Sequence, residues 1–375
     1  MDDRFNYKAN TGNEVSKKNL CLVVPSLTMG GMERVMSELA IYFFRNKNAQ
    51  VNLVLLAKRE RFYILPEGIN VFEPPFHYKK YSKIVHFVKT ISYLRKTISK
   101  INPDTILSFC ERYNSFVILS LFFLKYKLFI SDRSSPLASS GRYVDFLNRY
   151  LYKLADGIIA QTKIAKDILY SRNKHKNITI IGNPIKQIER NPAIEKENII
   201  LNIGRFADKK NQDLLLRYFK EINDPSWKII FVGDGFKMKN VIKLSEELGL
   251  SDKVEFAART NDIQNYYSKA KIFAFTSASE GFPNALGEAL STPVACISFD
   301  CVAGPADLIE NGVNGFLIKE NDDEDYVKKL KLLMNDSLLR ERFEKEAIKK
   351  IQKYNIQSIG NLFYNFITDN SKVSG

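Results

Sequence analysis

The sequence has few of the residues that bind transition metals or form disulfides. Its 375 residues include four cysteines and three histidines, and no two cysteines have the C-x-x-C spacing of a zinc or redox site. This composition predicts reduced thiols and excludes a disulfide-stabilised scaffold. The fingerprint G-x-G-x-x-G is also missing, which argues against a nicotinamide dehydrogenase.

Long apolar stretches are equally scarce. Residues 1–18 are polar and mixed in charge, so they lack the apolar core of a signal peptide and predict a flexible tail. The most apolar run, residues 116–130, is interrupted by Lys125 and Lys127, whereas about 20 apolar residues are needed to cross a bilayer. This run predicts a buried helix leading into a strand. We therefore expect a cytoplasmic protein that is soluble or peripheral on the inner face of the membrane.

The positive charge is concentrated in the first half of the chain. The formal net charge is +14, and residues 1–190 hold 31 Lys and Arg against 15 Asp and Glu. Segment 79–100 has seven basic residues and no acidic one, and its apolar residues recur at helical spacing. This basic amphipathic helix suits an anionic membrane surface, and a core-packed helix with a solvated basic face has the same pattern. The charge also suits nucleic acid, but no nucleic-acid-binding motif is present.

Short apolar runs alternate with longer helical patterns along the chain. The runs are residues 19–24, 51–56, 105–109, 127–131, 157–160 and 178–181 in the first half, and 199–204, 228–233, 253–257, 271–276, 293–298 and 315–318 in the second. Uniformly apolar strands between helices predict parallel sheets that are covered on both faces. Twelve strands are too many for one comfortable sheet, so we predict an α/β protein of two Rossmann-like doubly wound domains that face a cleft. The polar segment 183–198 is the predicted linker.

Three predicted strand-to-helix loops carry unusual residues. Gly30 and Gly31 follow the first strand, where glycine allows the backbone to approach a ligand closely, although a simple tight turn has the same composition. Residues 204–211, GRFADKKN, place Arg205 and Lys210 where they can clamp a diphosphate, and a solvated basic loop is the alternative. Residues 276–290 carry Glu280 and Glu288, eight positions apart.

Together these segments resemble the motifs of retaining GT-B glycosyltransferases, notably glycosyltransferase family 4. EGFPNALGEAL resembles the E-x7-E motif, SLTMGGMER the Gly-Gly loop, and GRFADKKN the G-R-x-x-x-x-K motif, while residues 299–318 resemble a later Gly-rich segment. The resemblance covers about residues 19–355. It implies transfer of a hexose or N-acetylhexosamine from a UDP-sugar to a lipid-diphosphate-linked glycan, with retention of configuration, in O-antigen, capsule or related surface-polysaccharide synthesis. Among UDP-sugars, a galactose-series donor is favoured.

The resemblance also implies a domain order and residue roles. Residues 19–185 would bind the acceptor, residues 186–355 would bind the nucleotide sugar, and a helix and tail at 356–375 would pack back on the first domain. Arg205 and Lys210 would hold the diphosphate and stabilise the leaving group, and Glu280 would hold the transferred sugar. Further implied donor contacts are Gly30, Gly31, Gly281, Phe282, Pro283, Asn284, Glu288 for the ribose, and Arg259 and Thr260 for the base.

The sequence departs from the family pattern after its fourth predicted strand. Family members often carry His there, whereas this chain has Asp132 and Arg133 on the implied acceptor side, with Arg133 in the His place. Arg133 can add positive charge near the phosphates. Because fixed cations can stabilise a leaving diphosphate, and no D-x-D run lies in a predicted loop, we expect no metal and no cofactor. A GT-B-like sugar-nucleotide epimerase and a basic nucleic-acid-binding protein remain the alternatives.

Overall fold

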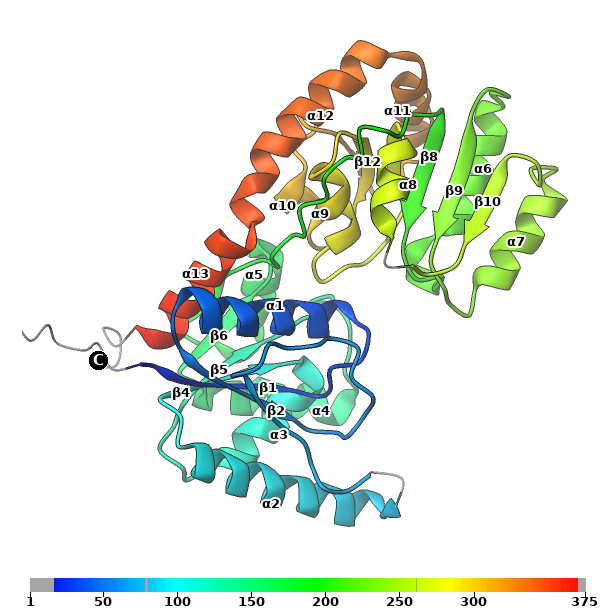
Figure 1. The fold of residues 1–375 in the computed structure, drawn as a ribbon. Helices are drawn as coiled ribbons and strands as arrows, with labels where there is room; N and C mark the ends of the chain where they lie inside the picture. Colours follow the sequence, from blue (N-terminus) through cyan, green and yellow to red (C-terminus); the bar gives the residue numbers. More distant parts are fainter. Residues whose placement is uncertain (1–16, 78–79, 261, 370–375) are drawn as a thin grey trace, which may run out of the picture.

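The computed structural model describes residues 17–77, 80–260 and 262–369. Two α/β lobes make up the molecule, an N-terminal lobe that is blue to green and a C-terminal lobe that is green to orange in Figure 1. Nearly all of the predicted 1–18 tail, Lys79 of the basic segment, and the chain after Asp369 lie outside the described residues. Two lobes of parallel sheet and helix confirm the predicted fold class.

The N-terminal lobe is built on a seven-stranded parallel sheet with the order β3-β2-β1-β4-β5-β6-β7. Its strands are β1 (Asn19–Val24), β2 (Gln50–Leu55), β3 (Asn70–Phe72), β4 (Thr105–Phe109), β5 (Lys127–Ser131), β6 (Gly157–Ala160) and β7 (Ile178–Ile180). Its helices are α1 (Gly31–Asn46), α2 (Lys83–Ile101), α3 (Glu111–Leu121), α4 (Arg142–Leu151) and α5 (Lys163–Asn173). The sequence did not predict β3, because a three-residue edge strand without a fully buried residue leaves almost no apolar pattern.

The C-terminal lobe has a six-stranded parallel sheet with the order β10-β9-β8-β11-β12-β13. Its strands are β8 (Ile199–Ile203), β9 (Lys228–Val232), β10 (Val254–Ala257), β11 (Ile272–Phe275), β12 (Ala295–Asp300) and β13 (Phe316–Lys319). Its helices are α6 (Gln212–Ile222), α7 (Met238–Glu247), α8 (Ile263–Lys269), α9 (Asn284–Leu290), α10 (Pro305–Leu308), α11 (Asp323–Asn335) and α12 (Ser337–Ile351).

Both sheets reverse their strand order once, between β1 and β4 and between β8 and β11. In open parallel sheets, ligands bind beyond the carboxyl ends of the strands at such reversal points. The loops that follow β1 and β4, and those that follow β8 and β11, are therefore the places where a site is expected. Three of these four loops are the ones that carry the motifs.

The chain crosses between the lobes twice, and the two crossings lie side by side. The Ile185 backbone N–H donates to the Tyr354 carbonyl at 2.8 Å. A Cβ on Gly182 would lie 2.7 Å from the Phe282 ring and 3.2 Å from the Tyr354 ring, so glycine is needed for this close approach. Ile185 is buried in the core of the C-terminal lobe, so the predicted linker begins as packed structure rather than as a solvated spacer.

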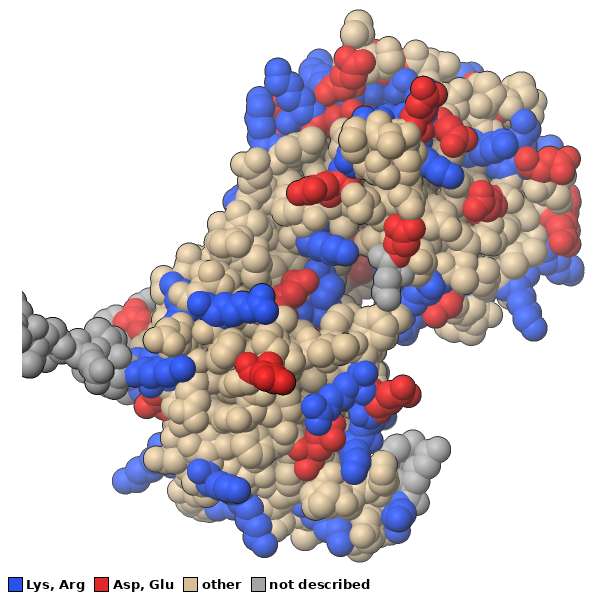
Figure 2. All heavy atoms as spheres, viewed as in Figure 1, with Lys and Arg blue, Asp and Glu red and all other residues tan. Residues whose placement is uncertain are grey.

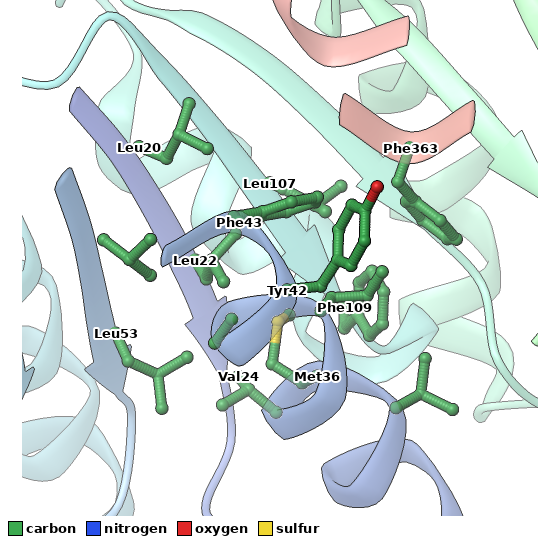
Figure 3. Close-up of a cluster of buried hydrophobic side chains, with 14 of the residues drawn as sticks. Leu20, Leu22, Val24, Met36, Tyr42, Phe43, Leu53, Leu107, Phe109 and Phe363 are labelled. Atoms are coloured by element: carbon green, nitrogen blue, oxygen red, sulfur yellow. The ribbon is translucent and has the colours of Figure 1, made fainter. Parts of the chain in front are cut away.

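The last helix, α13 (Ile356–Thr368), returns to the N-terminal lobe after the second crossing. Its Ile359, Phe363 and Ile367 join the core cluster of β1, β2, β4 and α1. Figure 3 shows Phe363 from α13 beside Tyr42 and Phe109. The Tyr42 hydroxyl also donates to Asn361 Oδ1 at 2.9 Å. The N-terminal lobe is therefore completed by α13, which follows the C-terminal lobe in the sequence.

Candidate functional site

A cavity of about 630 Å³ lies between the carboxyl edges of the two sheets. Figure 2 shows the lobes parting at the right of the view, where the cleft opens. The lining comes from both lobes: Gly31, Met32, Arg133, Gln161 and Asn183 from the first, and Ile203, Gly204, Arg205, Ala207, Lys210, Phe275, Glu280, Gly281, Phe282, Pro283, Asn284 and Ala285 from the second. Most of the predicted donor-site residues therefore meet in one space.

The loop that carries Arg205 is held by a neighbouring glycine turn. The Phe206 backbone N–H donates to the Asp234 carbonyl at 2.7 Å. Gly233 and Gly235 have φ angles of +155° and +149°, and a Cβ on either would lie about 2 Å from a carbonyl oxygen of this loop. Sequence reasoning missed this G-D-G turn, although two glycines around an aspartate after a predicted strand were a usable signal.

Lys210 and Glu280 form an ion pair on the floor of the cavity. Their side chains are only 26% and 12% exposed, so water screens this pair less than a surface pair. The loops are also joined through the backbone: the Thr276 hydroxyl donates to the Lys210 carbonyl at 2.9 Å, and the Ala278 N–H donates to the Lys209 carbonyl at 2.9 Å. The two predicted motifs are thus linked by side-chain and backbone hydrogen bonds, and Glu280 holds the charged Lys210 in place.

The loop before α9 touches the N-terminal lobe. A Cβ on Gly281 would lie 2.7 Å from the Arg133 carbonyl oxygen and 3.0 Å from Gln161 Oε1, so no side chain fits there. Ser279 and Ser135 hydrogen bond through their hydroxyls at 2.7 Å across the cleft. Glycine at 281 therefore lets the Glu280 loop close against the opposite lobe.

Asn183 links the two lobes inside the cavity. Its Oδ1 accepts from Arg133 Nη1 and from Gln161 Nε2, both at 2.8 Å, and its Nδ2 donates to Asn284 Oδ1 at 2.9 Å. Asn183 is buried. Sequence analysis missed Asn183 and Gln161, because a single amide in a predicted linker or at a strand end carries no distinctive signal.

Arg133 is a half-buried cation whose guanidinium nitrogens Nε and Nη2 are buried, and it forms no ion pair with a carboxylate among the described residues. Its guanidinium lies 4.0 Å from the centre of the Phe109 ring and 5.2 Å from that of Phe363. Within the described part of the chain, its Nε and Nη2 have no hydrogen-bond partner and it takes part in no ion pair. Burial lowers the pKa of the guanidinium, and nearby Asp132 and Glu111 oppose this effect. A partly desolvated guanidinium with two unpaired N–H groups favours a bound anion.

The remaining predicted site residues lie outside the lining of this cavity. The Gly30 carbonyl accepts a hydrogen bond from the Tyr63 hydroxyl at 2.9 Å. Burial raises the pKa of this tyrosine, and the positive charge of Arg259 acts to lower it. Glu288 Oε1 lies 4.0 Å from Arg34 Nη2, and burial raises the pKa of this carboxyl. The Thr260 hydroxyl accepts from the Asp262 N–H at 3.0 Å.

Asp132 lines a different cavity, within the N-terminal lobe. Burial, and the neighbouring charge of Glu111, raise its pKa to about 7, while hydrogen bonds from Tyr152 and Asn114 and the charge of Arg172 lower it. Among the residues that the structure describes, no three His, Cys, Asp or Glu side chains cluster as a metal site would require.

The basic helix α2 is packed along only one half. Leu94 and Ile98 are buried, whereas Ile84, Phe87 and Val88 are 78%, 47% and 58% exposed. The predicted apolar stripe therefore packs on the lobe at one end and faces solvent at the other. Blue side chains surround the lower edge of the N-terminal lobe in Figure 2, where α2 runs in Figure 1. No helix in the described part of the chain combines the length and apolarity that crossing a bilayer requires.

Known proteins match both the fold and the sequence. The structure of TarM has a TM-score of 0.81 at 15% identity, with 95% of this chain and 99% of that one covered. Residues 29–187 match the family model described as Glycosyltransferase Family 4, and residues 184–350 match that of Glycosyl transferases group 1. The chain is a glycosyltransferase of the GT-B type. HepE from Anabaena, solved with UDP, has a TM-score of 0.78 at 17% identity over 93% of this glycosyltransferase and 98% of HepE.

Two relatives match this glycosyltransferase over most of its length. One, from Campylobacter jejuni, is named GalNAc-alpha-(1->4)-GalNAc-alpha-(1->3)-diNAcBac-PP-undecaprenol alpha-1,4-N-acetyl-D-galactosaminyltransferase, and it is 28% identical over 91% of this chain and 95% of its own. The other, the amylovoran biosynthesis glycosyltransferase AmsD from Erwinia amylovora, is 27% identical over 90% and 95%. Relatives of this glycosyltransferase therefore act in the synthesis of bacterial surface polysaccharides and lipid-linked glycans.

Proposed function

We propose that the protein transfers a hexose or N-acetylhexosamine from a UDP-sugar to a lipid-diphosphate-linked glycan, with retention of configuration, in synthesis of an O-antigen, capsule or related polysaccharide. The observation that carries the proposal is the convergence of Arg205, Lys210, Arg133 and Glu280 on one cavity between the sheets. The name of the Campylobacter jejuni relative supports the lipid-diphosphate acceptor and a galactose-series sugar. The UDP bound to the similarly folded HepE supports the nucleotide.

Different residues of the cleft bind different parts of the donor. Arg205 and Lys210 bind the diphosphate, and Glu280 with the backbone of residues 281–284 binds the transferred sugar. Lys210 is already held by Glu280, so it can bridge the sugar-binding carboxylate and the phosphates without a large movement. Gly30 and Gly31 admit the donor closely, Glu288 binds the ribose beside Arg34, and Arg259 and Thr260 bind the base.

The reaction transfers the sugar between two oxygens. The bond from the anomeric carbon to the phosphate oxygen breaks, and its electron pair leaves with the diphosphate. The acceptor hydroxyl forms the new bond on the face that the diphosphate leaves, and its proton passes to a leaving phosphate oxygen. Arg205, Lys210 and Arg133 offer fixed positive charge where negative charge develops, which is the largest single contribution in many enzymes. This scheme calls for no metal and no cofactor.

Because the proposed acceptor is anchored to the membrane by its lipid, the enzyme is proposed to work at the inner face of the cell membrane. The exposed apolar end of α2, with Ile84, Phe87 and Val88, lies beside Lys80 and Lys83, which are also exposed. Apolar side chains flanked by lysines bind anionic lipid surfaces through both burial and charge. This end of α2 is therefore the proposed membrane contact.

A donor panel tests the proposal directly. Purified protein is incubated with several UDP-sugars and an undecaprenyl-diphosphate-linked glycan, and the product linkage is determined by NMR. We expect UDP release that depends on the acceptor and an anomeric configuration equal to that of the donor. An inverted product would refute retention. Epimerised UDP-sugar without acceptor would favour an epimerase, and salt-dependent binding of DNA or RNA would favour a nucleic-acid-binding protein.

A further inference from the structure

A pair of opposite charges joins the two lobes beside the donor cavity. Arg34 lies on α1 of the N-terminal lobe and Glu288 on α9 of the C-terminal lobe, and Arg34 Nη2 lies 4.0 Å from Glu288 Oε1. The two side chains are 16% and 12% exposed, so water screens this contact less than it screens a surface pair. A charge on the first lobe can therefore act on whatever Glu288 binds.

The pair lies one helical turn beyond the lining of the donor cavity. Gly31 begins α1 and Asn284 begins α9, and both residues line the cavity. A Cβ on Gly31 would lie 3.1 Å from Asn284 Nδ2, so the two helices begin close together. Arg34 and Glu288 follow these residues by three and four positions, the spacing of one helix face. Glu288 therefore shares a face of α9 with a residue that lines the cavity, and Arg34 stands opposite it.

Arg34 is shared between two carboxylates. Its Nη1 donates to Glu38 Oε1 at 3.0 Å, one turn further along α1, and its Nη2 donates to the Pro184 carbonyl at 3.4 Å. The helix itself gains little from Arg34, because a cation near the N-terminal end, with its acidic partner after it, opposes the helix dipole. Since two anions share one cation, removing either carboxylate changes the charge that acts on the other.

The protonation of Glu288 depends on these neighbours. Burial raises its pKa, the positive charges of Arg34 and Lys186 act to lower it, and the negative charge of Glu38 raises it further. The other titratable group beside it is Tyr267 of α8, whose own pKa is raised by burial and then by the charge of Glu288. An ionised carboxylate only accepts hydrogen bonds and can pair with two hydroxyls, whereas a protonated one also donates. The charge of Arg34 therefore favours the form of Glu288 that accepts from a diol.

We infer that Arg34 is a positioning residue, which holds Glu288 as an oriented carboxylate for the ribose hydroxyls of the nucleotide, and that Glu38 weakens this hold by sharing the guanidinium. The inference rests on the proposed function, because it takes the ribose contact of Glu288 from there. It adds that α1 of the N-terminal lobe acts on nucleotide recognition through Glu288 and not through a contact of Arg34 with the nucleotide.

The experiment compares UDP with 2′,3′-dideoxy-UDP, which lacks both ribose hydroxyls, by calorimetric titration of the full chain. At pH 8 we expect the wild type to bind UDP about tenfold more tightly or better, since the dideoxy nucleotide loses hydrogen bonds to a charged group. In Arg34→Gln this preference falls to about threefold or less, with unchanged affinity for the dideoxy nucleotide. Arg34→Lys keeps the charge and most of the preference. Arg45→Gln, an exposed arginine on the same helix, is the matched control and keeps all of it.

The pH dependence of this preference separates positioning from a purely structural role. In the wild type the preference for UDP falls as the pH drops and Glu288 is protonated. The midpoint moves to higher pH in Arg34→Gln and to lower pH in Glu38→Gln, because one variant removes a positive charge and the other a negative one. An unchanged preference in Arg34→Gln, midpoints that move in the same direction, or an equal loss of affinity for both nucleotides overturns the inference. Failure of the proposed function differs, because the wild type then binds UDP without preference or not at all.

Discussion

Replacing Arg133 with methionine is expected to stabilise the protein and to impair it as an enzyme. Methionine keeps an unbranched apolar stem against Phe109 and Phe363 but removes the charge. The two N–H groups without partners cost about 1–3 kcal/mol each while they stay unbonded. The substitution removes that cost.

The stabilising contacts that the methionine variant loses contribute a free energy similar to the cost that it removes. The hydrogen bond to Asn183 contributes about 1.5–3 kcal/mol. Stacking of the cation on Phe109 contributes about 0.5–2 kcal/mol. Asn183 Oδ1 still accepts from Gln161, so no new unpaired group appears. Since the desolvation cost of the charge also disappears, we expect the free energy of unfolding to rise by about 1–3 kcal/mol.

The same substitution removes a cation from the donor cavity. Loss of one preorganised charge contact to the leaving group is expected to lower kcat about 10²- to 10³-fold. Thermal unfolding and steady-state kinetics on the same preparation measure both effects. Arg133→Lys keeps the charge and serves as the control, with part of the activity retained. A methionine variant that is less stable yet fully active would refute the reasoning, because the guanidinium would then be purely structural.

Three further perturbations follow from the structure. Lys210→Ala should lower kcat by about 10²- to 10³-fold with unchanged circular dichroism, and near-normal turnover would remove Lys210 from the mechanism. Because the pKa of Asp132 is raised in the folded state, its contribution to stability is present at low pH and is lost as pH rises towards about 7; Asp132→Asn should abolish this loss in thermal unfolding between pH 5 and 8. The ionised carboxylate should also raise kcat/KM for the acceptor through the same pH range, with a flat profile in Asp132→Asn. Ile84→Asp with Val88→Asp should reduce flotation with anionic vesicles but leave transfer to a water-soluble acceptor intact, and equal flotation would exclude this contact.

The sequence was most informative where structure is local. Strands such as β1 and β11 could be predicted because their residues are buried on both faces and therefore uniformly apolar. The location of Arg205, Lys210 and Glu280 at the cleft could then be predicted from the strands, because a loop after a parallel strand lies at the carboxyl edge of its sheet. These predictions needed no knowledge of which segments meet.

The contacts between distant segments could not be predicted in this way. The pairing of Asn183 with Asn284 joins residues about 100 positions apart, and nothing in either neighbourhood indicates the other. The apolar stripe of α2 predicted the helix but not which part of it packs on the lobe. Ile84 and Ile98 occupy equivalent positions in the sequence pattern, yet only Ile98 is buried. The cavity that Asp132 lines within the N-terminal lobe is formed by the loop of residues 134–140, α4 and α5, and its shape exists only in the folded chain.

The return of α13 to the N-terminal lobe has a consequence during translation. Domains usually fold in order as they leave the ribosome, with the N-terminal one first. Here the core around Tyr42 and Phe109 lacks Phe363 until the whole C-terminal lobe and α13 have been made. The N-terminal lobe of the nascent chain therefore keeps an apolar face uncovered until α13 reaches it. Chaperone demand should accordingly be highest just before α13 is made, and deletion of α13 should cause aggregation of the lobe made first.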